Sequence, residues 1–266
     1  MKLATYSVDG EDQLGLVVGD GLVSISRHLA GAPANMIALM QRWSEFAGPV
    51  GALQDRRPDA ELGAVRLRAP VPRPGKSLAI GLKTSVAGPY DPIELPVVSD
   101  DLDYEAELVM VIGRRARNVP QSRAHEVIFG YCAGNDVSVR DWQLRVSQWT
   151  IGKSFETHAP FGPWITTADE ADGSDLDIRC LVNGEVRQSS NTKHLLFDCH
   201  AQVAFLSKVM TLEPGDVIFT GTPGGVGMGS QPPAYLEADD RVRVEIDKLG
   251  HIENRVVRGS QETTIE

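Results

Sequence analysis

The stretch DYEAELVMVIG, residues 103–113, restricts the possible folds of this chain more than any other segment of the sequence. It contains an unbroken apolar run, residues 108–112, which is typical of a strand that other elements cover on both faces. Glu105 and Glu107 precede this run and are separated by one residue, and such side chains point to the same face of a strand. Two carboxylates at the mouth of a buried strand repel each other and lose hydration, so we expect a compensating cation there.

The composition is that of a soluble globular protein and excludes several classes of partner. The 266 residues are 42% hydrophobic, enough for one large domain or for a small and a larger one. A net charge of −10 without a basic run argues against nucleic acid or anionic membranes as partners. No window approaches the ~18 apolar residues of a membrane span. The opening lacks a signal-peptide core and three scattered cysteines suit a reducing compartment, so we expect a cytoplasmic protein.

The apolar pattern predicts two units. Residues 1–70 are expected to form a small α+β domain, and the proline-rich segment 69–76 marks its boundary with a mainly β domain over 71–266. In the first unit we expect a hairpin over 2–20, a strand at 21–26 and a helix over 34–47. In the second we expect strands at 77–82, 102–113, 125–136, 216–222, 241–247 and 252–257, a hairpin at 178–189 and a helix over 195–210.

A third acid strengthens the interpretation of the two glutamates as a metal site. Asp136 follows the predicted strand 125–136, where the chain turns polar. Three carboxylates without cysteine or histidine at ligand spacing are typical of a site for a hard cation, Mg²⁺ or Mn²⁺ rather than Ca²⁺. The alternative, that the glutamates are solvated or salt-bridged residues at a sheet edge, stays open on spacing alone.

Two further segments could contribute chemistry. Lys153 lies between Ile151 and Phe155, and apolar surroundings can lower the pKa of a lysine so that it shuttles protons or clamps a carboxylate. The alternative is a surface lysine whose stem packs on apolar neighbours. The glycine-rich segment 220–229 lacks the GK[ST] ending and following helix of a phosphate loop, so it is either an anion-binding turn or a structural one.

Several segments together resemble the fumarylacetoacetate hydrolase family. They are GPYDPIELP, LDYEAELVMVIG, GNDVSVRDWQ, WTIGKSF, CLVNGEVRQSSNT, LEPGDVIFTGTPGGVG and VRVEIDKLGHIEN, in the family's order over residues 74–254. The resemblance implies an α+β fold, a mixed and mostly β-roll or β-sandwich domain with a small N-terminal domain, usually assembled as a homodimer. It also assigns roles to residues at matching positions. By this resemblance Glu105, Glu107 and Asp136 bind Mg²⁺ or Mn²⁺, Lys153 is the active-site lysine, and Lys83, Tyr90, Arg140, Gln143 and Thr222 lie at the substrate.

One departure from the family's pattern affects the predicted reaction. After IGL, residues 80–82, the family continues into a lid helix of roughly twenty residues, judged by usual helix and loop lengths. That helix carries the histidine and glutamate that activate water in the hydrolases, whereas here Leu82 is followed directly by Lys83. Either the natural protein has a mobile lid that this sequence omits, or the lid is deleted. A Leu82–Lys83 Cα separation well beyond ~3.8 Å would support the first explanation.

The predicted substrate is a small 2-oxo or 2,4-dioxo acid that chelates the metal, which stabilises the enolate form. We expect hydrolysis of a C–C bond in an acylpyruvate-type 2,4-dioxo acid, which requires a base that activates water. The alternative is an oxaloacetate decarboxylase or tautomerase, or a 2-hydroxy-dienedioate isomerase, at the same site, and this alternative leads if the lid is truly absent. A ligand-binding protein without turnover is a third possibility.

Overall fold

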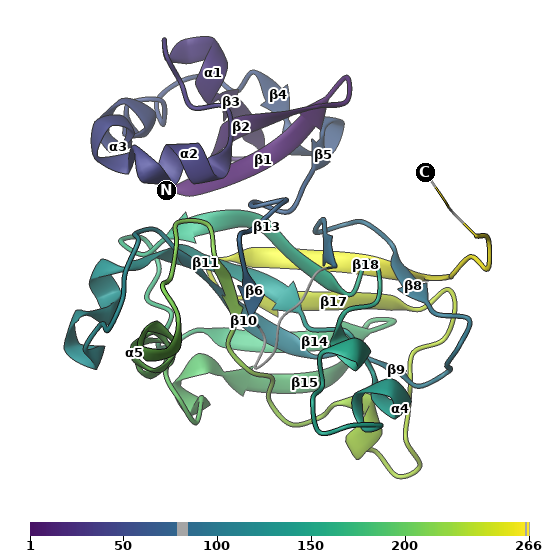
Figure 1. Ribbon diagram of the computed structural model, residues 1–266. Coiled ribbons are helices and arrows are strands. Elements are labelled where there is room, and N and C mark those ends of the chain that lie inside the picture. The colour runs from purple at the N-terminus through teal and green to yellow at the C-terminus, as the bar shows by residue number, and fades with distance from the viewer. Residues whose placement is uncertain (79–84, 264, 266) are drawn as a thin grey trace.

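The computed structural model of the chain describes residues 1–78, 85–263 and 265. Figure 1 shows a small N-terminal unit lying above a larger body made mainly of strands. The fold is mixed α+β with few helices, which confirms the predicted class. Among the described residues, every helix is too short or too polar to cross a bilayer.

The small unit contains the predicted hairpin and an interrupted helix. Its elements are β1 (Lys2–Val8), β2 (Glu11–Val18), β3 (Gly21–Ser24), α1 (Ile25–His28), α2 (Met36–Gln41), α3 (Trp43–Gly51), β4 (Ala60–Glu61), η1 (Leu62–Ala64) and β5 (Arg66–Leu67). Asp9 and Gly10 join β1 to β2 with φ of 51° and 87°, as in a type I′ turn. The single helix predicted over 34–47 is wrong, because Arg42 leaves the helical range with φ −109° and ψ 21°. The break places the Trp43 ring edge-on against Phe129, with ring centroids 5.0 Å apart, a tertiary contact that the local pattern does not contain.

The larger body holds the remaining elements. They are β6 (Ser77–Leu78), β7 (Val86–Ala87), β8 (Ile93–Leu95), β9 (Leu102–Asp103), β10 (Ala106–Ile112), η2 (Gln121–Glu126), β11 (Ile128–Asn135), β12 (Ser138–Val139), α4 (Arg140–Gln143), η3 (Ile151–Lys153), β13 (Ala159–Thr167), β14 (Asp177–Val182), β15 (Glu185–Asn191), η4 (Thr192–His194), α5 (Cys199–Val209), β16 (Val217–Phe219), η5 (Gly227–Gly229), β17 (Arg241–Ile246) and β18 (Gly250–Arg258). The predicted hairpin at 178–189 is confirmed as β14–β15, with φ of 53° at Asn183 and 83° at Gly184. The predicted helix over 195–210 begins only at Cys199, because the Asp198 carboxylate accepts a hydrogen bond from the Ala201 amide and caps it there.

Two sheets organise the body. The first runs in the order β4-β3-β2-β1-β13-β11-β10-β16-β6, and the second in the order β15-β14-β17-β18-β8. Strand β13 was not predicted, because Pro160 and Pro163 interrupt its pattern. It pairs with both β11 and β1, so one sheet continues from the small unit into the large one. The predicted boundary near residue 70 lies in the coil between β5 and β6, and the division into two domains stays a prediction.

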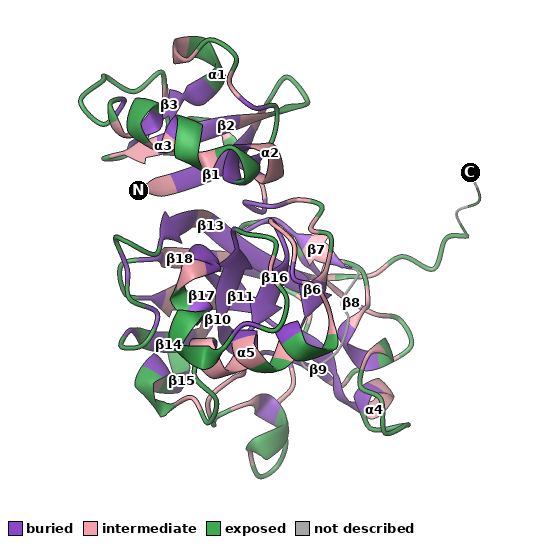
Figure 2. Ribbon diagram, turned by 60° about the vertical axis from the view of Figure 1, so that its left-hand side comes forward, coloured by how far each residue is buried: buried purple, intermediate pink, exposed green. Residues whose placement is uncertain are grey.

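Strand β10 lies at the centre of the core, as its apolar run predicts (Figure 2). Leu108, Met110 and Ile112 pack into the cluster that faces the second sheet. Val109 and Val111 point the other way, into the cluster shared with the small unit. Burying one such side chain contributes about 1.5–3 kcal/mol, so this strand is firmly held. A rigid strand fixes the position of whatever precedes it.

Candidate metal site and proton carrier

Glu105 and Asp136 meet because the β10–β11 ladder ends between them. The last pair of the ladder is Ala106 opposite Asn135. Just beyond it, the Asn135 side-chain oxygen accepts a hydrogen bond from the Glu105 amide at 2.9 Å, and the Asp136 amide donates to the Glu105 carbonyl at 2.9 Å. Both backbone groups of Glu105 are therefore held by the end of the neighbouring strand. The predicted long strand 102–113 is interrupted here, since Tyr104 and Glu105 belong to neither β9 nor β10.

The three predicted metal ligands converge in the structure. Glu105, Glu107 and Asp136 each offer a carboxylate oxygen, and these oxygens lie within 4.8 Å of one another. All three side chains are buried. Glu107 accepts a hydrogen bond from the Gly221 amide at 2.7 Å. Burial raises the pKa of Glu107 well above its usual range, and repulsion by the Asp136 and Glu105 carboxylates adds to this shift.

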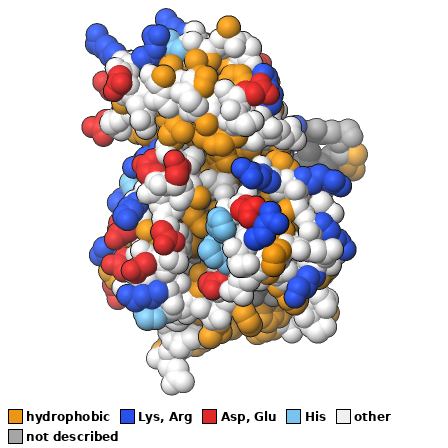
Figure 3. All heavy atoms as spheres, turned by 90° about the vertical axis from the view of Figure 1, so that its left-hand side faces the viewer, with side chains coloured by type: hydrophobic (Ala, Val, Ile, Leu, Met, Phe, Trp, Pro, Cys, Tyr) orange, Lys and Arg blue, Asp and Glu red, His pale blue; other side chains and the backbone are white. Residues whose placement is uncertain are grey.

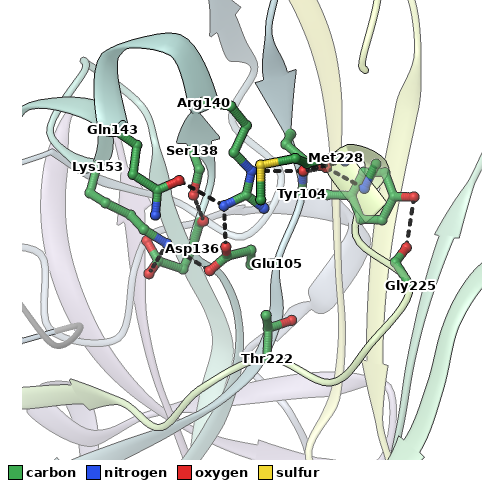
Figure 4. A network of polar contacts seen from close by, with 12 residues as sticks. Tyr104, Glu105, Asp136, Ser138, Arg140, Gln143, Lys153, Thr222, Gly225 and Met228 are labelled. Carbon is green, nitrogen blue, oxygen red and sulfur yellow. Dashed lines mark hydrogen bonds and ion pairs between the residues drawn. The ribbon is translucent and has the colours of Figure 1, made fainter. Parts of the chain in front are cut away.

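Two buried cations reach the same carboxylates (Figure 4). The Lys153 ammonium donates to Glu105 Oε2 at 2.6 Å and to Asp136 Oδ2 at 2.8 Å. Arg140 Nη1 donates to Glu105 Oε1 at 2.6 Å. Burial opposes the charge on Lys153, but Asp136, Glu105 and Glu107 outweigh it, so its pKa is raised. The lowered lysine pKa that apolar neighbours predicted is therefore wrong, because the ammonium faces carboxylates and not its apolar sequence neighbours.

The charges of the site leave room for one divalent cation. Among the described residues, four buried carboxylates face two buried cations, which leaves two negative charges uncompensated. The carboxylates belong to Asp103, Glu105, Glu107 and Asp136, and the cations are Arg140 and Lys153. All the candidate donor atoms are hard oxygens, which Mg²⁺ and Mn²⁺ prefer. Geometry, charge and donor chemistry thus fit the predicted Mg²⁺ or Mn²⁺.

Close backbone packing brings Lys153 to the site. A Cβ on Gly152 would lie 2.4 Å from the Gln143 amide nitrogen, so only glycine lets η3 approach α4 this closely. Gln143 is buried, and its side-chain oxygen accepts a hydrogen bond from Arg140 Nη1 at 2.9 Å. Arg140 and Gln143 therefore lie at the carboxylates, and their contact with a substrate stays a prediction.

Two other predicted substrate-binding residues, Thr222 and Tyr90, do not join this cluster. The Thr222 hydroxyl donates its proton to the carbonyl of Ala106, the residue between Glu105 and Glu107, at 2.9 Å. The same hydroxyl accepts a hydrogen bond from the Gln188 side chain. Tyr90 is 46% exposed and its hydroxyl donates to the His251 carbonyl at 3.3 Å. Lys83 and the Leu82–Lys83 junction lie outside the described residues. Their assignment to a substrate site stays a prediction.

The structure adds two residues that the sequence interpretation overlooked. Asp103 is fully buried and accepts a hydrogen bond from Arg140 Nε at 2.8 Å. Gln188 accepts from the Ala106 amide at 3.0 Å and donates to Thr222 and to the Pro223 carbonyl, which ties the glycine-rich segment to β10. Asp103 had a signal, because it precedes Glu105 by the same spacing that separates Glu105 from Glu107. Gln188 had none, since it reaches the site from another sheet.

A hollow of about 1150 Å³ lies beside the site and not at it. Its lining includes Leu195, Phe197, Phe205, Gly221 and Thr222, but none of the carboxylates. Gly221, whose amide binds Glu107, is part of its lining. The face that carries α5, seen in Figure 3, exposes hydrophobic side chains. Leu196 and Phe197, which precede α5 along the chain, are exposed.

Comparison with known proteins identifies the class to which this fold and site belong. The model of the fumarylacetoacetate (FAA) hydrolase C-terminal family matches residues 52–257, so the chain belongs to this family. Its relatives include enzymes named as hydrolases, isomerases and tautomerases.

Individual relatives cover nearly the whole chain. The fumarylacetoacetate hydrolase domain-containing protein 2 homolog of Dictyostelium discoideum is 37% identical over 299 residues, 96% of this chain and 97% of the relative. The human oxaloacetate tautomerase FAHD2A, named as mitochondrial, is 36% identical over 92% of this chain and 87% of its own. A maleylpyruvate hydrolase from Sphingobium sp. SYK-6, solved with manganese(II) and pyruvate, superimposes with a TM-score of 0.85 at 33% identity, covering 98% of this chain and 100% of that one. The expected cytoplasmic location and homodimer stay predictions.

Proposed function

We propose that this protein is a divalent-metal-dependent enzyme that interconverts the keto and enol forms of a small 2-oxo acid of the oxaloacetate type. The observation that carries the proposal is the position of Lys153, a buried proton carrier whose ammonium bonds two of the three converging carboxylates. Several relatives of similar identity are named oxaloacetate tautomerases, which supports this choice of substrate. A bound Mg²⁺ or Mn²⁺ would polarise the 2-oxo group and favour loss of a proton from C3.

Lys153 can perform the whole proton transfer. In the enol-to-keto direction its ammonium donates a proton to C3, and the amine left behind takes the proton from the oxygen at C2. The ammonium is thereby restored and the substrate has changed only the place of one proton. The raised pKa of Lys153 keeps the group in the acidic form that begins this direction.

Two buried donors beside the carboxylates support the proposal that the site holds an acid. Arg140 Nη2 and Asn135 Nδ2 are buried and have no hydrogen-bond partner among the described residues. Each belongs to a side chain that already bonds Glu105, so both lie next to the metal ligands. Unpartnered buried donors are costly unless a ligand supplies an acceptor, and a carboxylate supplies two.

Hydrolysis of an acylpyruvate-type 2,4-dioxo acid is the second candidate. It is favoured by the likeness to the maleylpyruvate hydrolase solved with manganese(II) and pyruvate. Hydrolysis, however, needs a base that activates water at the distal carbonyl. The histidine and glutamate that the family resemblance assigns to that task have no counterpart in this sequence after Leu82. Tautomerisation needs no such base, so we place it first.

A substrate panel with Mn²⁺ or Mg²⁺ tests the proposal. Purified protein is mixed with oxaloacetate prepared as the keto or the enol form, with acylpyruvates and with other 2,4-dioxo acids. We expect metal-dependent interconversion of the oxaloacetate tautomers above the rate in buffer with metal alone. Cleavage of an acylpyruvate without tautomerisation would replace the proposal by the second candidate. Turnover that EDTA leaves unchanged would contradict both.

A further inference from the structure

The Asp103 carboxylate is a junction between the glycine-rich segment and the metal site. Its Oδ1 accepts hydrogen bonds from the amides of Tyr104 and Gly227, at 2.9 and 2.7 Å. Its Oδ2 accepts from the Met228 amide at 3.0 Å and from Arg140 Nε at 2.8 Å. Each oxygen has two donors, so the carboxylate is fully satisfied although no atom of Asp103 is exposed.

The segment that binds Asp103 contains a glycine, Gly227, at the point of closest approach. A Cβ on Gly227 would lie 2.7 Å from Asp103 Oδ1 and 2.2 Å from the Ala234 carbonyl oxygen, so no other residue fits there without displacement. The Leu236 amide also donates to the Leu102 carbonyl at 2.7 Å, next to Asp103. The loop between β16 and β17 is thus fastened to β9 by both side-chain and backbone bonds.

Arg140 links Asp103 to Glu105, one of the proposed metal ligands. Its Nε binds Asp103 and its Nη1 binds Glu105 Oε1, so one planar guanidinium spans the two carboxylates. Its backbone is fixed as well, because the Arg140 amide donates to the Asp101 carbonyl at 2.9 Å. Since the guanidinium is rigid, the place of Nε determines the place of Nη1.

We infer that Asp103 is a positioning residue for the metal centre, acting on Glu105 through Arg140; the inference rests on the metal site of the proposed function. Asp103 acts on the metal centre in two ways. It orients the guanidinium so that a single nitrogen, Nη1, bonds Glu105. It also neutralises the Arg140 charge, which would otherwise repel a dication bound a few ångströms away.

Loss of the Asp103 charge should therefore weaken metal binding specifically. Arg140 would be free to turn and take Glu105 with two nitrogens, and one additional positive charge would remain beside the site. Partners that orient metal ligands typically contribute about 10- to 100-fold to metal affinity when they are removed. A purely structural Asp103 would instead change stability and leave the affinity of the folded protein as it was.

The test is the Mn²⁺ affinity of the Asp103→Asn variant, measured by calorimetric titration of the full chain without substrate. Asp216→Asn is the matched control, because Asp216 is also fully buried and paired with a cation, Lys76, but lies at the other end of β10. Thermal unfolding without metal measures stability in parallel. We expect Mn²⁺ to bind Asp103→Asn about 10-fold or more weakly than wild type, and Asp216→Asn to bind within about twofold of wild type.

Combining Asp103→Asn with Arg140→Gln tests whether the effect passes through Arg140. We expect Asp103→Asn to change Mn²⁺ affinity less than about threefold in the Arg140→Gln background, because the guanidinium that Asp103 orients against Glu105 is gone. Equal effects in both backgrounds would overturn the inference. If Asp103→Asn does not fold, Arg140→Lys replaces it, since lysine keeps the charge but cannot span both carboxylates.

The outcomes separate this inference from the proposed function. Wild-type affinity in folded Asp103→Asn overturns the inference and leaves the metal site standing. No Mn²⁺ binding by wild type itself overturns the proposed function, and with it the inference. Weakened binding in Asp103→Asn with normal binding in Asp216→Asn supports both.

Discussion

The two ends of β10 differ in how the charges of nearby buried acids are balanced. At the end near Ile112, the single carboxylate of Asp216 lies 2.6 Å from the Lys76 ammonium and also accepts the Glu213 amide. The other end of β10 lies near Ala106. There, among the described residues, the buried carboxylates, which include those of Glu105 and Glu107, outnumber the buried cations. The same strand therefore begins in a surplus of negative charge and ends beside a matched pair.

This contrast separates a buried acid that is paired with a cation from a group of buried acids whose excess charge fits a bound cation. Breaking a one-to-one pair leaves an uncompensated charge, so the loss of such a pair lowers mainly the stability of the protein. A surplus of carboxylates destabilises the metal-free protein, so removing one of them relieves repulsion and impairs mainly function. The following changes test that contrast.

The largest effect is expected from Glu107→Gln, which removes one ligand charge but keeps an oxygen for the Gly221 amide. Metal catalysis of this kind contributes several kcal/mol, so turnover of the best substrate should fall about 10³-fold or more. Mn²⁺ affinity should fall with it, while the metal-free protein unfolds at the same temperature as wild type or higher. Full activity without added metal would contradict the site.

Lys153→Met should lower turnover about 10²-fold or more, because it removes the proposed proton carrier. Mn²⁺ affinity should be retained or increased, since the ammonium that occupies Glu105 and Asp136 is gone. Turnover follows the tautomerisation assay, and affinity follows titration of the folded variant. Weaker Mn²⁺ binding with normal turnover would reverse the assigned roles.

Asp216→Asn should show the opposite profile. We expect a loss of about 1–3 kcal/mol in the free energy of unfolding, moderated because Lys76 is 25% exposed. Turnover should stay within about twofold of wild type. Urea unfolding and the tautomerisation assay measure the two quantities. A large loss of activity without loss of stability would show that the two ends of β10 are not independent.

The pH dependence of the metal-free protein should reveal the repelled glutamate. The unfolded chain releases the Glu107 proton near its ordinary pKa of 4.5, whereas the folded protein keeps it to higher pH. The folded state thus binds more protons in that interval, and wild type should lose stability relative to Glu107→Gln as pH rises above 4.5. The slope should reach about 1.4 kcal/mol per pH unit until Glu107 ionises in the folded state. Urea unfolding in EDTA at several pH values measures this difference, and parallel curves would refute the shift.

Local sequence patterns predicted the convergence of the three carboxylates because strand geometry is local. The alternate spacing of Glu105 and Glu107 and the strand-end position of Asp136 suggested carboxylates that converge, and they do. The same spacing includes Asp103, whose role was overlooked because its partners Arg140 and Gly227 come from distant segments. Strand β13 was also missed, because its prolines conceal a strand that pairs on both sides.

The order of residues along the chain was sufficient to predict the buried central strand, the three convergent carboxylates and membership of the fumarylacetoacetate hydrolase family. The charge balance around those carboxylates emerged only from the folded arrangement. Apolar neighbours along the chain suggested a low pKa for Lys153, yet the folded chain surrounds its ammonium with carboxylates and raises that pKa. Electrostatic energies depend on distances in space, and folding sets those distances between residues that lie far apart along the chain.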